Sequence, residues 1–449
     1  MPSRSFEVLE RVRGIICYSM YKMSNIKSKI THLIEHKMFE TFMFINILGY
    51  ALFKISYRPL GDIFQSFIVL GFLLFLFCDF KKAIKDKAFI CLFLSILLTC
   101  LSWINSTFQI PHLAKDSPNI GILADLFFFI FIAYWLKGSI KKVRTLWLFY
   151  AIGVFLTALI HSNDILTDIM NGIAGQRIDF NYVNANHLGA LSGIILLVST
   201  YYAFKLKAIK HKILLTLFIL VPSLFIVIVT QGRQIWLAIL ITSISTPILT
   251  AIISKKINIK SLILILSTLI IATYLASNTK IIENRLHNEN DIIPIILSGD
   301  INNIPYSSMG IRIHFWSEAI SWIKKHPLLG TGEDTRNLVI KESTHIPQEI
   351  KMEFSHLHNG HIELIASYGL LGFSLFLYIY SLIMYSSKFY KENNEVLIIS
   401  TMFILFFVII NCFESFFFFK TGEYMINIIF GGIYTFYLTH NLSIKDNNE

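Results

Sequence analysis

The sequence has 449 residues, of which 54% are hydrophobic and only 15% are charged, and its formal net charge is +10 at pH 7. A soluble domain carries about a quarter of charged residues, so this composition excludes an ordinary soluble enzyme and predicts a membrane protein. Membrane orientation explains the excess of basic residues, so no nucleic-acid partner is expected.

The first segment, residues 1–38, interleaves basic residues such as Arg11, Lys22 and Lys29 with apolar positions. It contains neither the apolar core nor the cleavage site of a signal peptide. We therefore expect a basic amphipathic arm on the cytoplasmic surface of the membrane.

Apolar runs long enough to cross about 30 Å of hydrocarbon follow one another through most of the chain. They predict an all-α polytopic membrane protein with about twelve transmembrane helices, nine within residues 39–277 and three within 357–439. The predicted spans are 39–55, 62–80, 88–106, 120–136, 145–161, 185–204, 213–230, 234–253, 261–277, 360–384, 395–412 and 423–439.

Clusters of lysine fall in every second connection, for example at 81–87 and 205–212. The positive-inside rule then places these connections, the amino terminus and the tail 440–449 in the cytoplasm. It leaves one large periplasmic loop, residues 278–356. Within that loop, Ile311, Phe315, Ile320 and Ile323 recur at helical spacing between capping serines and Pro327, which predicts an amphipathic helix on the membrane face. The run "LLGTGEDTRN" that follows predicts turns.

The stretch "HLHNGHIELIASYGLLG", residues 356–372, carries histidines at the outer end of an apolar run. If the helix includes His358, then Gly369 and Gly372 share its face, and a neighbouring helix can approach closely there. An imidazole held at that outer mouth can accept a proton at neutral pH. The alternative is that these are interfacial histidines beside an ordinary small-residue packing face.

A metal site is a further alternative, because His356, His358, His361 and Glu363 are close in sequence. On a helix, however, His361 and Glu363 are about 160° apart, whereas zinc-binding helices place ligands at i and i+4. We therefore expect no metal and no cofactor. Glu363, one turn into the predicted span, is expected either to orient a histidine or to face an aqueous cavity.

Two arginines stand at the outer face. Arg233 lies at the junction of two apolar runs, and Arg312 opens the predicted amphipathic helix. The guanidinium group matches phosphate oxygens, and a helix amino terminus also favours anions. The alternatives are that Arg233 snorkels at the membrane boundary and that Arg312 is simply solvated.

These residues resemble a family. His358-Asn359, nine further residues, and then Gly369-Leu370-Leu371-Gly372 are similar to the His-[Asn/Ser/Gln]-x9-Gly-x-x-Gly signature of bacterial O-antigen ligases. The segments "TQGR" with Arg233, "GIRIHFW" with Arg312, and "QRIDFNYVNANHLGALSG" with Arg177 also resemble ligase segments, in the ligase order. The related O-antigen polymerases share this general plan.

The resemblance implies a glycosyltransferase of the bacterial inner membrane with its active site facing the periplasm. Such an enzyme moves an O-antigen polysaccharide from undecaprenyl pyrophosphate to a sugar hydroxyl of the lipid A core, without a metal. In this interpretation His358 is the base, and Arg233 and Arg312 stabilise the charge of the leaving pyrophosphate. Asn359, Glu363 and Arg177 are expected to position substrate.

Two other classes remain possible on sequence alone. An O-antigen polymerase would extend carrier-linked repeat units and would not need the lipid A core. A transporter or flippase would also cross the membrane many times, but transporters tend to carry paired repeats and broken helices at the midplane. The sequence shows no such repeat, and its polar residues gather at the outer face.

Overall fold

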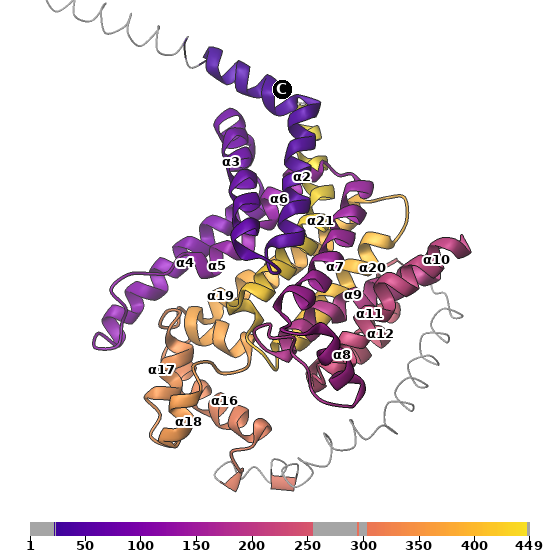
Figure 1. The fold of residues 1–449 in the computed structure, drawn as a ribbon. Coiled ribbons are helices and arrows are strands. Elements are labelled where there is room, and N and C mark those ends of the chain that lie inside the picture. The colour runs from indigo at the N-terminus through magenta and orange to yellow at the C-terminus, as the bar shows by residue number, and fades with distance from the viewer. Residues whose placement is uncertain (1–21, 23, 255–293, 296–302, 447–449) are drawn as a thin grey trace, which may run out of the picture.

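The computed structural model describes residues 22, 24–254, 294–295 and 303–446, and all regular structure within these ranges is helical (Figure 1). The first half contains α2 (Lys37–Phe53), α3 (Arg58–Ala83), α4 (Lys87–Gln109), α5 (Gly121–Ala124), η1 (Asp125–Phe127), α6 (Phe129–Leu136), α7 (Ile140–His161), α8 (Ile165–Ile173) and α9 (Ala185–Lys205). The second half contains α10 (Ile209–Leu215), η2 (Thr216–Leu220), α11 (Val221–Val229), α12 (Arg233–Ser254), α16 (Ser308–Lys325), α17 (Thr335–Lys341), α18 (Gln348–Glu353), α19 (Gly360–Ser386), η4 (Ser387–Phe389), α20 (Glu395–Asn411), η5 (Phe416–Phe418) and α21 (Lys420–Asp446).

The all-helical prediction is confirmed for the described residues, and seven helices there are long and apolar enough to cross a membrane. These are α3, α4, α7, α9, the continuous run Ile209–Val229, α12 and the run Gly360–Phe389. Each predicted span coincides with helix except 261–277, which lies outside the described residues. The count of twelve therefore remains a prediction.

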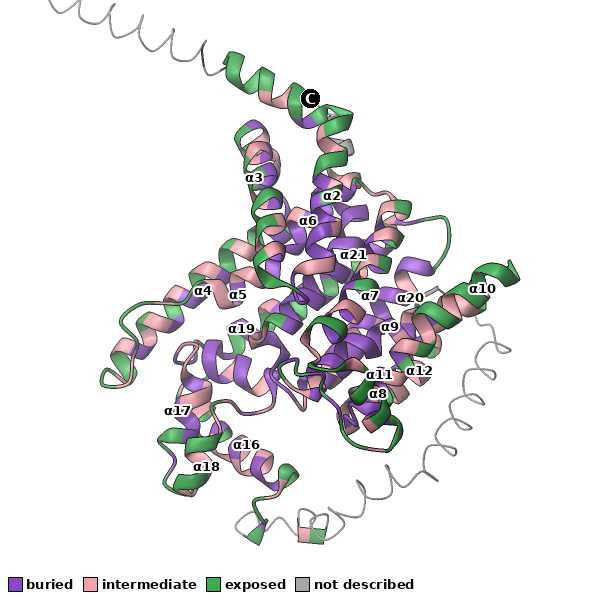
Figure 2. Cartoon of the chain, viewed as in Figure 1, coloured by how far each residue is buried: buried purple, intermediate pink, exposed green. Residues whose placement is uncertain are grey.

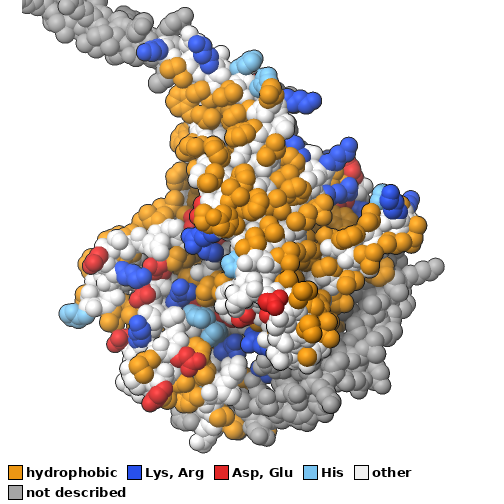
Figure 3. All heavy atoms as spheres, in the orientation of Figure 1, with side chains coloured by type: hydrophobic (Ala, Val, Ile, Leu, Met, Phe, Trp, Pro, Cys, Tyr) orange, Lys and Arg blue, Asp and Glu red, His pale blue; other side chains and the backbone are white. Residues whose placement is uncertain are grey.

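The bundle buries aromatic residues inside and presents apolar residues outside (Figures 2 and 3). Its largest fully buried side chains include Trp135, Tyr368, Tyr424 and Phe403. Large apolar residues such as Leu70 are also exposed along the helices. A helix that is apolar on every side is typical of a membrane span, because hydrocarbon and not water surrounds it.

The predicted span 120–136 is a broken helix, formed by α5, η1 and α6. A break exposes backbone groups that must find partners inside a bundle. Asn427 of α21 supplies them, because its Oδ1 accepts from the Phe129 N–H at 2.8 Å and its Nδ2 donates to the Asp125 carbonyl at 2.9 Å. One buried amide thus fixes α21 against α6.

Helices α16, α17 and α18 form a group at one end of the bundle, where α16 and α17 pack against α19. The described carboxyl end of α21 lies at the other end (Figure 1). The predicted amphipathic helix is α16, whose amino terminus is capped by Ser307 and which ends before Pro327. Its buried face differs from the prediction: Ile311, Phe315 and Ala319 are buried, whereas Ile320 is exposed. The i, i+4, i+8 spacing of that face fits one side of a helix better than the predicted set.

Helix α19 is interrupted at Gly369, which has φ 68° and ψ −171°. The segment 327–332 crosses α19 at this break. The Leu370 N–H donates to the Pro327 carbonyl at 2.8 Å, and the Gly332 N–H donates to the Ser367 carbonyl at 2.9 Å. The turns predicted for this segment are present, with Gly330 at φ 63° and Gly332 at φ 87°.

Candidate active site

Two histidines share one carboxylate oxygen where the connection to α19 meets the connection after α20. His358 Nδ1 lies 3.1 Å from Glu414 Oε1, and His356 Nε2 lies 3.3 Å from the same oxygen. The rings of the two histidines are 4.0 Å apart between centroids. The Glu414 side chain is only 1% exposed, whereas that of His358 remains 15% exposed. The carboxylate therefore lies beneath two imidazoles that solvent can reach.

Charges and burial set the protonation of this cluster. Burial would raise the pKa of Glu414, but hydrogen bonds from His356 and His358 outweigh it and hold that pKa well below its usual range. Burial lowers the pKa of His358, although the Glu414 carboxylate opposes the shift. An ionised carboxylate can only accept, so each histidine must donate its proton to Oε1. His358 then carries its proton on Nδ1, and its Nε2 is the basic nitrogen.

His358 is not part of the helix, which corrects the predicted glycine-lined face. Its φ is 53°, in the left-handed region, and α19 begins only at Gly360. The glycines serve another purpose. A Cβ on Gly369 would overlap the Leu328 carbonyl, so the segment 327–332 is what approaches there. Strained backbone of this kind is common at functional sites, because surrounding contacts hold a side chain in place.

A polar chain connects this cluster to Arg177. Asn186 Nδ2 donates to Glu414 Oε2 at 3.4 Å, and Arg177 Nη2 donates to Asn186 Oδ1 at 3.4 Å. Arg177 Nε also donates to the Thr230 carbonyl at 3.1 Å. The predicted substrate-binding Arg177 therefore lies in the same polar network as His358.

Arg233 is the first residue of α12. The turn before it is tight, with Gln231 at φ 49°. A Cβ built on Gly232 would lie 3.4 Å from Asn186 Oδ1. The junction predicted from the sequence is thus packed against Asn186, which contacts Glu414.

Arg312 approaches the cluster from α16. It is the fifth residue of that helix, and its Nη1 donates to the Ser308 carbonyl at 2.7 Å and to the Ser308 hydroxyl at 3.0 Å. Its charge is among the causes that lower the pKa of His358, which requires the two side chains to be near each other. Arg312 therefore acts electrostatically on His358, and the residue before Arg233 packs against Asn186 of the same polar network.

Asn359 and Glu363 support the histidine segment from below. Asn359 caps α19, and its Oδ1 accepts from the N–H groups of His361 and Ile362 at 3.1 Å each. The Glu363 side chain is 0% exposed, so it does not face an aqueous cavity. Its Oε1 accepts from the Leu357 N–H and the Ser415 hydroxyl at 2.6 Å each. Both side chains hold the backbone on either side of His358.

Of the four residues considered as metal ligands, His361 and Glu363 separate from His356 and His358 in the structure. His361 points to α20, where its Nε2 lies 2.9 Å from the Val408 carbonyl, and Glu363 is enclosed as described. Among the described residues, His356, His358 and Glu414 form the group whose ligand atoms lie within 4.8 Å of one another. Two imidazoles and a carboxylate are suitable ligands for zinc. In this structure, however, the imidazoles donate to the carboxylate, which accounts for the same geometry without an ion.

Comparison with known proteins adds to this geometry. Residues 217–377 match the protein family described as O-antigen ligase. No curated protein matches the chain. The matched ligase segment includes Arg233, Arg312 and His358, whereas Arg177 and Glu414 lie outside it.

The matched family is one of membrane enzymes of the ligase and polymerase type, and the described chain has seven helices long and apolar enough to cross a membrane. Sequence reasoning missed two residues of this polar cluster, Glu414 and Asn186. Glu414 is 56 positions from His358 along the chain, so no local spacing connects them. A signal did exist, because a lone acid in "NCFESFFFF" is costly among aromatic residues unless it is paired.

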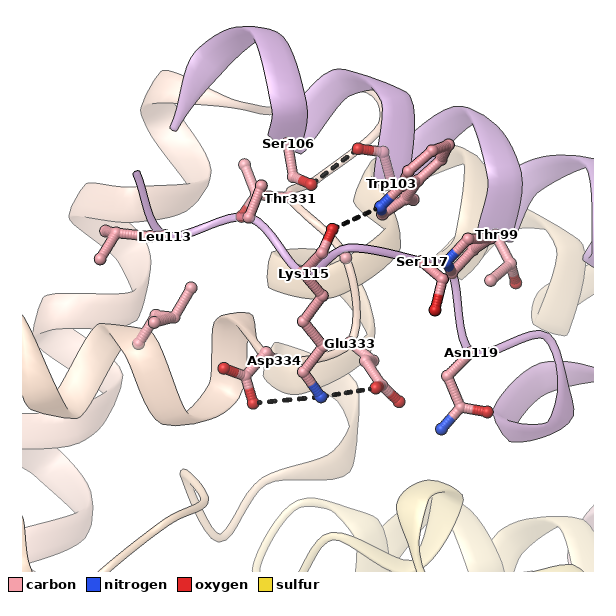
Figure 4. Close-up of a pocket in the computed structure, with 14 residues that line it drawn as sticks. Thr99, Trp103, Ser106, Leu113, Lys115, Ser117, Asn119, Thr331, Glu333 and Asp334 are labelled. Carbon is pink, nitrogen blue, oxygen red and sulfur yellow. Dashed lines mark hydrogen bonds and ion pairs between the residues drawn. The ribbon is translucent and has the colours of Figure 1, made fainter. Parts of the chain in front are cut away.

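A pocket lies at the end of α4, and it is lined by none of the residues of the polar cluster described above (Figure 4). Lys115 bridges Glu333 at 2.7 Å and Asp334 at 3.6 Å there, and the Trp103 indole N–H donates to the Lys115 carbonyl at 2.8 Å. None of the predicted site residues lines this pocket. Its ion pairs join the segment 110–119 to the start of α17.

Proposed function

We propose that this protein transfers an O-antigen polysaccharide from undecaprenyl pyrophosphate to a sugar hydroxyl of the lipid A core, at the periplasmic face of the bacterial inner membrane. The observation that carries the proposal is the hydrogen bond between His358 Nδ1 and Glu414 Oε1. It leaves Nε2 of a partly exposed imidazole as the proposed base, on the matched segment that also carries Arg233 and Arg312.

The chemistry follows from these groups. His358 Nε2 takes the proton of the acceptor hydroxyl as that oxygen bonds to the anomeric carbon of the donor sugar. The bond from this carbon to the pyrophosphate oxygen breaks, and the leaving group keeps the electron pair. Arg233 and Arg312 stabilise the negative charge that accumulates there, and Arg177 extends the same cationic surface.

Glu414 acts as the positioning residue for His358. Its carboxylate fixes the tautomer and stabilises the imidazolium that forms, as the acid of a catalytic triad does for its histidine. Asn359 and Glu363 act through the backbone at 357–363. Because the donor already contains an activated pyrophosphate linkage, the reaction needs no metal and no cofactor.

The alternative function is that of an O-antigen polymerase, which lengthens the carrier-linked glycan. Reconstitution of the purified protein with the lipid-linked glycan, with and without lipid A core, distinguishes the two. Product that forms only when lipid A core is present supports the ligase. Longer carrier-linked chains made in its absence would establish the polymerase instead.

The same assay tests metal independence. Activity should persist after EDTA treatment, because the two histidines donate hydrogen bonds to Glu414 and do not need a metal ion to hold them there. Loss of activity that zinc alone restores would instead assign His356, His358 and Glu414 as metal ligands.

A further inference from the structure

A second cavity opens in the wall of the bundle between α7, α9, the α10 to η2 segment and α21, and its empty space, including the part open to the surroundings, is about 580 Å³. Apolar side chains form most of its lining, and polar groups gather at one end. Residues that define it are Arg144, Ala151, Ile195, Tyr202, Leu215 and Ile219.

The polar end holds two cations on one buried carboxylate. Arg144 donates to Glu395 through Nε at 2.7 Å and through Nη2 at 2.6 Å, and Lys205 also pairs with Glu395. The Glu395 side chain is 0% exposed, whereas Arg144 is 43% and Lys205 is 32% exposed. The cations therefore face outward and the anion faces inward. Lys207, Lys210 and Lys212 follow directly in the chain and add to the positive charge.

The cavity has one polar end and an apolar remainder, as a membrane lipid has a polar head group and apolar chains. Tyr202 marks its polar end on α9, and Ile195 lies seven residues deeper, about 10 Å along a helix. A lipid whose phosphate lies by Arg144 and Lys205 would thus direct a chain toward the middle of the bundle. Basic pockets between spans are known to suit anionic head groups.

This cavity is distinct from the candidate active site. Asn186, which contacts Glu414, lies near the start of α9, and Tyr202 is sixteen residues further on, about 24 Å along that helix. The two sites therefore lie at opposite ends of a span and face opposite leaflets.

The helix that closes one side of the cavity is irregular. Residues Thr216–Leu220 form a π-helical turn, η2, between α10 and α11, and Leu215 and Ile219 on this run line the cavity. A π-helical turn costs regular hydrogen bonds and is found frequently at functional sites.

We propose that this cavity binds one chain of an anionic phosphoglycerolipid from the leaflet remote from His358, with the lipid phosphate held by Arg144 and Lys205. The bound lipid completes the wall that α7, α9 and η2 leave open. This inference does not depend on the reaction that the enzyme catalyses.

The test uses the full-length protein in nanodiscs that contain phosphatidylglycerol with a photoactivatable group in its acyl chain. After irradiation, peptide mass spectrometry maps the labelled residues. We expect labelling to concentrate on 194–199 and 215–219, and unlabelled phosphatidylglycerol to compete. Phosphatidylcholine carrying the same chain should label these peptides about fivefold less, because it lacks net negative charge.

Two variants fill the cavity, Ala151→Leu and Ile195→Trp, and each should reduce this labelling severalfold. Leu159→Trp is the matched control, since it enlarges an exposed side chain on α7 outside the cavity and should leave labelling unchanged. Labelling spread evenly over exposed apolar positions, equal labelling by both lipids, or competition by undecaprenyl phosphate alone would each overturn the proposal. The wild-type map decides the matter even if a filled variant fails to fold.

Discussion

At the scale of single residues, the arrangement of Glu414 explains why one histidine among several is suited to act as a base. Both His356 and His358 donate to Oε1, but His358 has the left-handed backbone that turns its ring toward this oxygen. His361 bonds instead to a backbone carbonyl of α20. His361 thus differs from the other two in its partner, whereas His358 differs from His356 in its left-handed backbone.

The first prediction concerns the proposed base and its partner. His358→Ala should lower kcat about 10²- to 10⁴-fold, because general base catalysis is lost. Glu414→Gln should cost on the order of 10²-fold, because the amide cannot fix the same tautomer. Turnover in the reconstituted transfer assay measures both. Glu349→Gln, an exposed acid on α18, is the control and should be neutral. Full activity of Glu414→Gln would contradict its positioning role.

The second prediction is the pH dependence. Because burial lowers the pKa of His358, the imidazole stays neutral as pH falls and becomes protonated only below its ordinary value of about 6.5. The acid limb of kcat/KM should therefore have its midpoint below pH 6.5. Arg312→Gln removes one cause of the lowered pKa and should move this midpoint upward. A wild-type midpoint above pH 6.5 would rule out His358 as the titrating base.

The third prediction concerns the arginines. Arg233→Ala and Arg312→Ala should each reduce transfer strongly, and lysine at either position should restore only part of it, because an ammonium group cannot reproduce the planar guanidinium fork. Initial rates at saturating donor measure this, with membrane insertion checked by the amount of folded protein. Complete rescue by lysine would show that charge alone is needed.

At the scale of elements, the sequence predicted the apolar helices well and their interruptions poorly. Composition and length are sufficient for a span such as α7, because its whole surface is apolar. The break at Gly369 depends on a segment about forty residues earlier, at Leu328, that no helical periodicity connects to it. Periodicity along one helix likewise could not reveal the distant partner Glu414, and it wrongly included His358 in α19.

The fourth prediction tests that break. Gly369→Ala should destabilise the protein by at least about 1–3 kcal/mol of backbone strain and also displace the segment 327–332, because the new Cβ would overlap the Leu328 carbonyl. Gly332→Ala is the matched control, since Gly332 also has a positive φ but has open space around it. The melting temperature in detergent should fall further for Gly369→Ala. Equal shifts would mean that the close approach contributes nothing.

At the scale of the whole molecule, the candidate active site and the cavity beside Arg144 lie at opposite ends of the bundle. From the alternating basic clusters we expect the first of these ends to face the periplasm and the second to face the cytoplasm. Figure 1 draws both ends of the described chain at the same end of the bundle, the arrangement that the predicted topology requires.

The fifth prediction tests this orientation. In a variant without its native cysteines, Met352→Cys on the exposed surface of α18 should react with an impermeant maleimide added outside intact spheroplasts, and Lys207→Cys should react only after the membrane is opened. Labelling is read by gel mobility. Reaction of Lys207→Cys from outside, with Met352→Cys protected, would invert the topology and move the candidate site to the cytoplasm.

The crossing of α19 by the segment 327–332 also constrains the order in which the protein assembles. Asn105 donates to the Gly330 carbonyl at 2.7 Å, and the Gly332 N–H donates to Ser102 at 2.8 Å, so residues more than two hundred positions apart close one junction. Helices α4 and α19 can insert separately, but they cannot finish docking until the intervening chain has delivered this segment between them. Contacts between such distant residues form late. We therefore expect the junction between α4, α19 and the segment 327–332 to close late in folding.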